Sequence, residues 1–203
     1  MKNIPDATKV YTNLLHFLLR LNIDEAKGME FIDQLKLIQL KKYEHFQMQG
    51  EPVKYMGYVM EGKFRYYRID NEGNDRTLWF NSSFPFIGDY HSFLRKTSSE
   101  LSIQAMNDHD LLLFNYDQMM EMFDTNAATQ KLRTMLAERS MFGWRDIALS
   151  LHFDTAEERY HKLLTNHPNI EKEIPLKYIA SCLGISPETL SRIRKKSRRN
   201  SLS

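Results

Sequence analysis

The residues best equipped for recognition chemistry lie near the carboxyl end of the chain. Between Ser186 and Lys196, polar and basic side chains recur at three- and four-residue spacing, so they share one face of a predicted helix. A polar, basic helix of this length fits the major groove of duplex DNA. The residues that we expect at this interface are Ser186, Pro187, Glu188, Thr189, Ser191, Arg192, Arg194, Lys195 and Lys196.

Two helices and a tight turn over Leu176–Lys196 position that face. Gly184 permits a positive φ at the turn, and Ser186 followed by Pro187 is a helix start with a capping hydroxyl. The side chains predicted to be buried are Ile179, Ala180, Leu183, Ile185, Leu190 and Ile193. This pattern predicts a helix-turn-helix, and an ordinary αα-corner is the alternative.

The charge of the chain is concentrated at the same end. The 203 residues carry a net charge of only +2. Residues 155–203 hold ten Lys and Arg against five Asp and Glu, or +5, whereas residues 1–154 sum to −3. A basic module on a mildly acidic body is typical of nucleic-acid binders, although a solvated basic tail has the same composition.

Composition and motifs argue against several other classes of protein. Cys182 is the single cysteine, which excludes an internal disulfide, a Cys-based zinc site and a four-Cys iron–sulfur cluster, and predicts a reduced, cytoplasmic protein. Targeting segments and membrane spans are not expected. Catalytic signatures are missing, so we expect no enzyme and no metal site. Asp108-His109-Asp110 is interpreted as a solvated hairpin tip.

Elements of two kinds precede the helix-turn-helix. The first 40 residues have helical periodicity, and residues 43–114 contain short aromatic-rich strands separated by turns, which predicts an antiparallel β-roll or jelly roll. Helical periodicity returns from Tyr116 to about Phe153. A helix of some 25 residues lies along its own β core or pairs with its copy in a second subunit, and we favour dimerisation.

Four segments of the sequence resemble those of a known protein family. Ile179–Ile193 strongly resembles the C-terminal helix-turn-helix of the Crp/Fnr transcription regulators in their Bacteroidetes-like form, and Thr155–Tyr160 is similar to the helix that enters their DNA-binding domain. Gly57–Arg65 resembles the cyclic-nucleotide-domain hairpin, and Phe86–Asp89 resembles the entrance of the phosphate cassette. The resemblance covers nearly the whole chain, loosely over residues 1–40.

The resemblance implies roles for individual residues. Glu188 and Arg192 occupy base-reading positions, for which a carboxylate that accepts from cytosine N4 and a guanidinium that donates to guanine O6 and N7 are suited. Arg194, Lys195 and Lys196 are expected on phosphates. Because few residues follow Arg199, we expect the family's wing to be short or missing.

The nucleotide cassette of the family is altered here. Gly88-Asp89 keeps its Gly-acid pair, but a gapless count places the Arg-Ser pair of the family at Ser99-Glu100, where a carboxylate repels phosphate. The predicted effector pocket comprises Gly88, Asp89, Tyr90, Arg95 as the nearest substitute cation, Ser99, Glu100, and Trp144 and Arg145 of the long helix. We expect Trp144 to fill the pocket and cyclic AMP not to bind; other anions, apolar effectors or no effector stay open.

These observations predict an α+β protein in three parts. Residues 1–124 form a cyclic-nucleotide-binding-like β-roll or jelly roll with N-terminal helices, 125–153 a long dimerisation helix, and 154–203 a helix-turn-helix DNA-binding domain of the winged class whose wing is short or missing. The predicted function is that of a homodimeric transcriptional regulator that binds an inverted repeat in double-stranded DNA, with RNA polymerase as a further partner and no membrane. The alternative is a cyclic-nucleotide-binding sensor or interaction module without direct DNA regulation.

Overall fold

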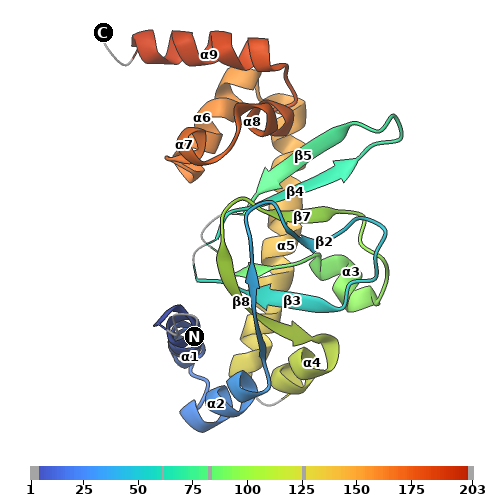
Figure 1. The fold of residues 1–203 in the computed structure, drawn as a ribbon, viewed down its shortest axis with the longest axis vertical. Coiled ribbons are helices and arrows are strands. Elements are labelled where there is room, and N and C mark those ends of the chain that lie inside the picture. Colours follow the sequence, from blue (N-terminus) through green and yellow to red (C-terminus); the bar gives the residue numbers. More distant parts are fainter. Residues whose placement is uncertain (1–4, 61, 82–83, 125–126, 201–203) are drawn as a thin grey trace.

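The computed structural model describes residues 5–60, 62–81, 84–124 and 127–200 (Figure 1). The predicted domain limits at residues 1, 125 and 203 therefore lie outside the described part. The helices are α1 (Pro5–Arg20), α2 (Glu25–Asp33), α3 (Tyr90–Arg95), α4 (Tyr116–Asp124), α5 (Ala127–Phe153), α6 (Ala156–Asn166), α7 (Ile170–Glu173), α8 (Leu176–Cys182) and α9 (Pro187–Asn200). The strands are β1 (Lys36–Leu40), β2 (His45–Gln47), β3 (Tyr55–Tyr58), β4 (Phe64–Ile69), β5 (Asp75–Phe80), β6 (Phe86–Ile87), β7 (Ser102–Ala105) and β8 (His109–Asn115).

The strands form the predicted antiparallel β-roll. They pair into two four-stranded sheets, in the orders β1-β8-β3-β6 and β2-β7-β4-β5. Alternating side chains of both sheets point inward, where Phe64, Ile87, Ile103 and Leu111 are fully buried. A second core lies where α1, α2 and α4 pack on β3 and β8. The fold class predicted from the sequence is therefore confirmed.

The helical prediction for the first 40 residues is wrong at its end. Residues 36–40 form the strand β1, which pairs with β8 from Lys36 opposite Leu113 to Leu40 opposite His109. Local spacing of Phe31, Leu35 and Ile38 fits a helix, but backbone pairing with a strand some seventy residues away overrides it. The short strands β2 and β6 were likewise not predicted.

The interpretation of Asp108-His109-Asp110 as a solvated tip is also wrong in its middle residue. Asp108 is exposed and accepts hydrogen bonds from Lys41 Nζ and Lys42 N, both at 2.9 Å. His109, in contrast, is buried at the start of β8, where its Nε2 accepts from Lys63 N at 3.1 Å and its ring packs on Phe64. The imidazole therefore has a structural role between two strands.

Helix α5 runs along the length of the molecule, from α4 at one end to the C-terminal helices at the other (Figure 1). Its 27 residues span about 40 Å. Leu132 and Leu136 in its first half are buried against the body. The second half exposes large apolar side chains: Met141, Phe142, Trp144, Leu149, Leu151 and Phe153. Burial against the chain's own core therefore explains only half of this helix.

Two histidines have pKa values that are lowered by their surroundings in the folded chain. His45 Nε2 lies 2.8 Å from the hydroxyl of Tyr67, and burial, followed by the charge of Arg65, lowers the pKa of His45. Burial, followed by the charge of Lys63, lowers the pKa of His167. Because both pKa values are lower in the folded chain than in the unfolded chain, the unfolded chain binds more protons just below the usual histidine pKa.

We predict that acidification destabilises the fold in the histidine range. The free energy of unfolding, measured with denaturant, should fall between about pH 7.5 and about pH 5.5, above the range in which carboxylates titrate. The double variant His45→Gln, His167→Gln should lose less stability over the same interval. An equal loss in the variant and the parent chain would contradict this assignment.

Candidate nucleic-acid interface and effector pocket

The two helices α8 and α9 meet at the predicted turn. Gly184 has a φ of 66°, a left-handed conformation that favours glycine. Its neighbour Ile185 donates from its backbone N–H to the Ala180 carbonyl oxygen at 3.0 Å, which closes the end of α8. Ile179, Ala180, Leu183 and Leu190 are buried between the helices. The helix-turn-helix geometry predicted from the sequence is confirmed.

The start of α9 is fixed by its own cap. Ser186 Oγ accepts a hydrogen bond from the Thr189 N–H at 3.2 Å, and the Leu190 N–H donates to the Ser186 carbonyl oxygen at 3.0 Å. Pro187 occupies the first helical position, where a missing N–H costs nothing. A rigid start matters because the first turns of such a helix carry the side chains that approach base edges.

Helix α9 lies at one end of the molecule (Figure 1), and the side chains of its polar face are mostly exposed. Arg192 Nη2 donates to Thr189 Oγ1 at 3.2 Å, so its guanidinium lies along this face. Contact with the Ser186 side chain, then the local backbone N–H and the charge of Arg192, lower the pKa of Glu188. The exposed residues are Ser186, Pro187, Glu188, Ser191, Arg192, Lys195 and Lys196, and Thr189 is half-buried.

Two of the predicted phosphate contacts are engaged by acidic residues. Arg194 is half-buried, and its Nε donates to Glu171 Oε1 at 2.5 Å; the Tyr160 hydroxyl donates to the same oxygen at 2.8 Å. Lys196 Nζ lies 2.7 Å from Glu157 Oε2 and is mostly exposed. The exposed ion pair between Lys196 and Glu157 is weak, so Lys196 can exchange Glu157 for a DNA phosphate. Arg194, in contrast, anchors α9 to α7.

Sequence reasoning missed one residue that holds this domain together. Arg159 donates from Nε and Nη2 to the Leu183 carbonyl oxygen, at 3.1 and 2.9 Å, and from Nη1 to the Asp154 carbonyl oxygen at 2.6 Å. It thus ties the end of α8 to the junction that follows α5. Nothing in the local pattern around Arg159 indicates this role. The start of α6 is capped by a reciprocal pair of Thr155 and Glu158.

The predicted effector residues separate into two groups. Gly88, Asp89 and Tyr90 come together with Ser99, because the Asp89 carboxylate caps α3 through the Ser92 N–H at 3.2 Å and accepts from Ser99 Oγ at 2.8 Å. Asp89 and Ser99 are both buried. The Asp89 carboxylate therefore already accepts the hydrogen bonds of the Ser92 N–H and the Ser99 hydroxyl near the start of α3.

The other group lies elsewhere. Arg95 is exposed in the last turn of α3. Glu100 is exposed and pairs with Arg68 at 3.3 Å, and Arg145 is exposed and contacts the adjacent Asp146 at 3.1 Å. These three side chains do not line the cavity beside Asp89, so the structure does not assemble a cation with the cassette from them.

A wide groove of about 1470 Å³ separates the β-roll from α5 and the C-terminal helices. Gly88, Asp89, Tyr90 and Trp144 contribute to its wall. Trp144 packs edge-to-face on Trp79 with ring centroids 4.7 Å apart, and Trp79 stacks on Tyr66 at 4.5 Å. Trp144 thus covers part of the aromatic wall and remains 44% exposed itself.

The described residues contain neither a metal-binding cluster nor a membrane-spanning helix. Among those residues, no group of three or more His, Cys, Asp and Glu side chains is placed to hold a metal ion. Over the same ranges, no helix combines the length and the apolar character that a membrane span requires.

Comparisons with known proteins agree with this geometry. Residues 37–126 match the cyclic nucleotide-binding domain family. FixK2 from Bradyrhizobium japonicum has a similar structure, with a TM-score of 0.69 and 20% identity over 82% of this chain and 86% of that one. The c-di-GMP-responsive global regulator CLP from Xanthomonas campestris has a TM-score of 0.64 and 18% identity over 88% and 94% of the two chains.

A third structure extends the similarity. A protein from Eubacterium rectale, described as a transcriptional regulator of the Crp/Fnr family, has a TM-score of 0.70 and 18% identity over 90% of this chain and 87% of that one. None of the curated proteins compared with this chain matches it. Residues 37–126 therefore match a cyclic nucleotide-binding domain, and the chain has the fold of the Crp/Fnr family transcriptional regulators.

Proposed function

We propose that this protein is a sequence-specific DNA-binding regulator of transcription that binds an inverted repeat as a homodimer. The observation that carries the proposal is the exposed face of α9, where Glu188 and Arg192 stand side by side on a capped helix over a buried core. In the proposed division, residues 1–124 form the effector domain, 125–153 the dimerisation helix and 154–203 the DNA-binding domain. Contact with RNA polymerase and a cytoplasmic location belong to the same proposal.

The chemistry of α9 favours duplex DNA as the partner. A guanidinium donates two parallel hydrogen bonds to guanine, and a carboxylate accepts from cytosine, so adjacent Arg192 and Glu188 can read neighbouring base pairs. Lys195 and Lys196 lie one turn further along, where cations meet the phosphate backbone. An interaction module without DNA activity is the alternative, but it leaves this outward-facing set of side chains unexplained.

The exposed half of α5 favours a dimer. Met135, Phe142 and Leu149 follow one another at seven-residue spacing and are exposed, and Phe153 is 80% exposed at the end of the helix. A soluble chain rarely exposes so many large apolar side chains along one helix unless a partner covers them. A second copy of α5 offers a matching apolar surface, and two-fold symmetry then presents two copies of α9.

The effector pocket is proposed not to be specific for cyclic AMP. A cyclic phosphate needs a cation and N–H donors, whereas the buried Asp89 carboxylate occupies the cap of α3 and is bonded to Ser99. Ser99-Glu100 stands where the resemblance expects the family's Arg-Ser pair, and neither Arg95 nor Arg145 lines the groove beside Asp89, so these residues do not supply the cation. The similar protein CLP is described as responsive to c-di-GMP, a different ligand.

We predict that Arg192 reads one base pair. In vitro selection from random duplexes should return an inverted repeat, and Arg192→Ala should weaken binding to it by about 1–3 kcal/mol and relax the preference at one position in each half. The matched variant Lys195→Ala should weaken binding to all duplexes alike and lower the salt dependence by about one phosphate. A uniform loss for Arg192→Ala would identify a phosphate contact instead.

We predict that the protein is a dimer in solution. In solution the protein should have twice the chain mass of 24.1 kDa, and Phe142→Glu should shift it to the monomer because it buries a charge in the proposed interface. Gln130→Glu places the same charge at an exposed position in the first turn of α5, away from the apolar second half, and should leave the mass unchanged. Analytical ultracentrifugation distinguishes the states, and a monomeric parent chain at micromolar concentration would contradict the proposal.

The third prediction concerns the effector. Calorimetry with cyclic AMP and cyclic GMP should detect no binding at micromolar concentration, because Ser99-Glu100 stands where the family's Arg-Ser pair binds the phosphate. Trp144→Ala opens the aromatic wall and should still bind neither nucleotide, which separates the loss of the Arg-Ser pair from simple obstruction. Micromolar binding by the parent chain or by this variant would overturn the interpretation of Ser99-Glu100.

A further inference from the structure

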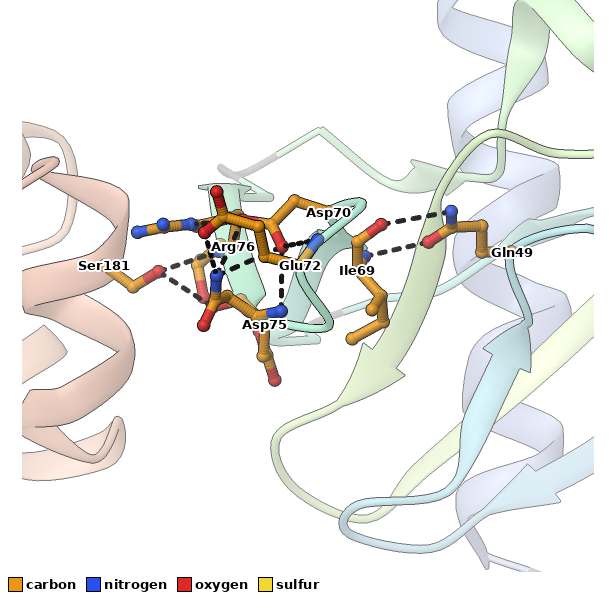
Figure 2. A network of polar contacts seen from close by, with 9 residues as sticks. Gln49, Ile69, Asp70, Glu72, Asp75, Arg76 and Ser181 are labelled. Atoms are coloured by element: carbon orange, nitrogen blue, oxygen red, sulfur yellow. Dashed lines mark hydrogen bonds and ion pairs between the residues drawn. The ribbon is translucent and has the colours of Figure 1, made fainter.

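The helix-turn-helix is docked on the β-roll through helix α8 and strand β5. Strand β5 is an outer strand of its sheet, so one side of its backbone lacks a strand partner. Ser181 of α8 supplies one: its Oγ accepts from the Thr77 N–H at 2.9 Å and donates to the Asp75 carbonyl oxygen at 3.4 Å (Figure 2). Cys182 Sγ lies 3.6 Å from the Leu78 carbonyl oxygen.

A buried cation joins the same two elements. Arg65 on β4 is only 2% exposed, and its guanidinium lies between two rings, 3.9 Å from the centroid of Tyr67 and 3.8 Å from that of Tyr178 on α8. Its Nη1 donates to Asp75 Oδ1 at 2.6 Å and to Thr77 Oγ1 at 3.2 Å. The cation is therefore fixed within the sheet and holds α8 by its aromatic ring.

Polar contacts also hold the hairpin that carries β5. Asp70 accepts hydrogen bonds at the β4–β5 turn, and its carboxylate pairs with Arg76 at 2.9 Å (Figure 2). Those hydrogen bonds, that of Arg76 first, lower the pKa of Asp70 to about 2, so the carboxylate stays charged at neutral pH. Gln49 bonds Ile69 through both its N–H and its carbonyl oxygen, which ties the hairpin to the roll. The surface that receives α8 is thus itself rigid.

Apolar packing continues across the junction. Phe80 and Met106 of the β-roll are buried in one cluster with Ile179 of α8 and with Leu183, which directly follows α8, and Leu190 of α9 belongs to that cluster. Lys63 and Glu173 form an ion pair beside it. The docking therefore reaches α9 through a shared core, and it leaves the polar face of α9 exposed at the end of the molecule (Figure 1).

We propose that Arg65 is a positioning residue that fixes the orientation of α9 by holding α8 against the β4–β5 hairpin, and that it thereby sets the half-site spacing which the dimer accepts. The proposal rests on the DNA-binding function proposed above. Two recognition helices bind adjacent half-sites together only when their separation matches the helical repeat. A domain released from β5 keeps its contacts to one half-site, but the second half-site then binds at a lower effective concentration.

Four variants, one of them a matched control, test the contact between the Arg65 guanidinium and the Tyr178 ring. Arg65→Met keeps the bulk and removes the cation. Because it also removes the guanidinium that donates to Asp75 Oδ1 and Gln104 Oε1, Tyr178→Leu is the second variant, which removes only the ring on α8. Tyr178→Phe keeps the ring. Arg68→Met is the matched control, since Arg68 lies on the same strand and is exposed in a pair with Glu100. Thermal melts by circular dichroism establish that each variant is folded.

The first readout does not depend on DNA. Cys182 is the only cysteine and lies in the α8–β5 junction, where burial raises the pKa of its thiol to about 12. Alkylation by iodoacetamide should be slow in the parent chain, in Tyr178→Phe and in Arg68→Met, and about tenfold faster in Arg65→Met and Tyr178→Leu. Fast alkylation of Cys182 in the parent chain, or an unchanged rate in both Arg65→Met and Tyr178→Leu, would overturn the proposal.

The second readout uses the duplexes obtained by selection. Arg65→Met and Tyr178→Leu should bind a single half-site as the parent chain does, but bind the full inverted repeat about tenfold more weakly and tolerate added base pairs between its halves. Unchanged spacing preference in both variants would overturn the role of Arg65. Failure to select any duplex would instead contradict the proposed function, while the alkylation rates would still report whether Arg65 holds α8 in place.

Discussion

The contact between α8 and the outer strand β5 is the interaction on which the arrangement of this molecule depends. An outer strand presents unpaired backbone groups, and a helix-turn-helix presents an apolar face that it cannot bury alone. Ser181 serves the first need and Phe80 and Met106 serve the second, so one contact completes both units. The orientation of α9 follows from it, because Leu190 is buried in the same cluster.

Burying the Arg65 cation at this contact is physically demanding. A guanidinium removed from water needs compensating partners, and here they are the Asp75 carboxylate, the oxygens of Thr77 and Gln104, and two aromatic rings. Such a group stabilises one arrangement strongly and tolerates few others. A buried cation shared between a sheet and a separate helical unit therefore makes their relative orientation specific, which apolar packing alone does less well.

The groove beside Asp89 and the second half of α5, in contrast, leave apolar side chains exposed to solvent. The Asp89 carboxylate is satisfied by Ser92 and Ser99, but the groove beside it is wide and lined by partly exposed aromatic rings. The second half of α5 presents Phe142, Leu149 and Phe153 to solvent on the far side of the same groove. Much of the exposed apolar surface therefore lies along α5, which is the helix proposed above to pair with its copy in a second chain.

Local signals in the sequence predicted the elements whose geometry is encoded within a few residues. Gly184 at a left-handed turn and Ser186 as a cap depend on neighbours a few residues away, and both are found as predicted. Short aromatic-rich segments separated by turn residues likewise indicated most strands of the roll. The resemblance of Ile179–Ile193 to the Crp/Fnr family identified the fold class before any contact was known.

Contacts between distant residues were decided only by the tertiary structure. Residues 36–40 have helical spacing and form a strand because β8 offers a backbone partner, and His109 looks exposed in sequence but is enclosed by β4. Arg65, Arg159 and Arg194 give no local sign of their roles, since each has partners ten or more residues away: Asp75 and Tyr178 for Arg65, Leu183 for Arg159 and Glu171 for Arg194. By itself, the sequence determined the helix-turn-helix and the roll, because turns, caps and periodicity act over a few residues. The tertiary structure decided how these units are joined, because burial of a charge and pairing of a strand edge depend on which surfaces meet.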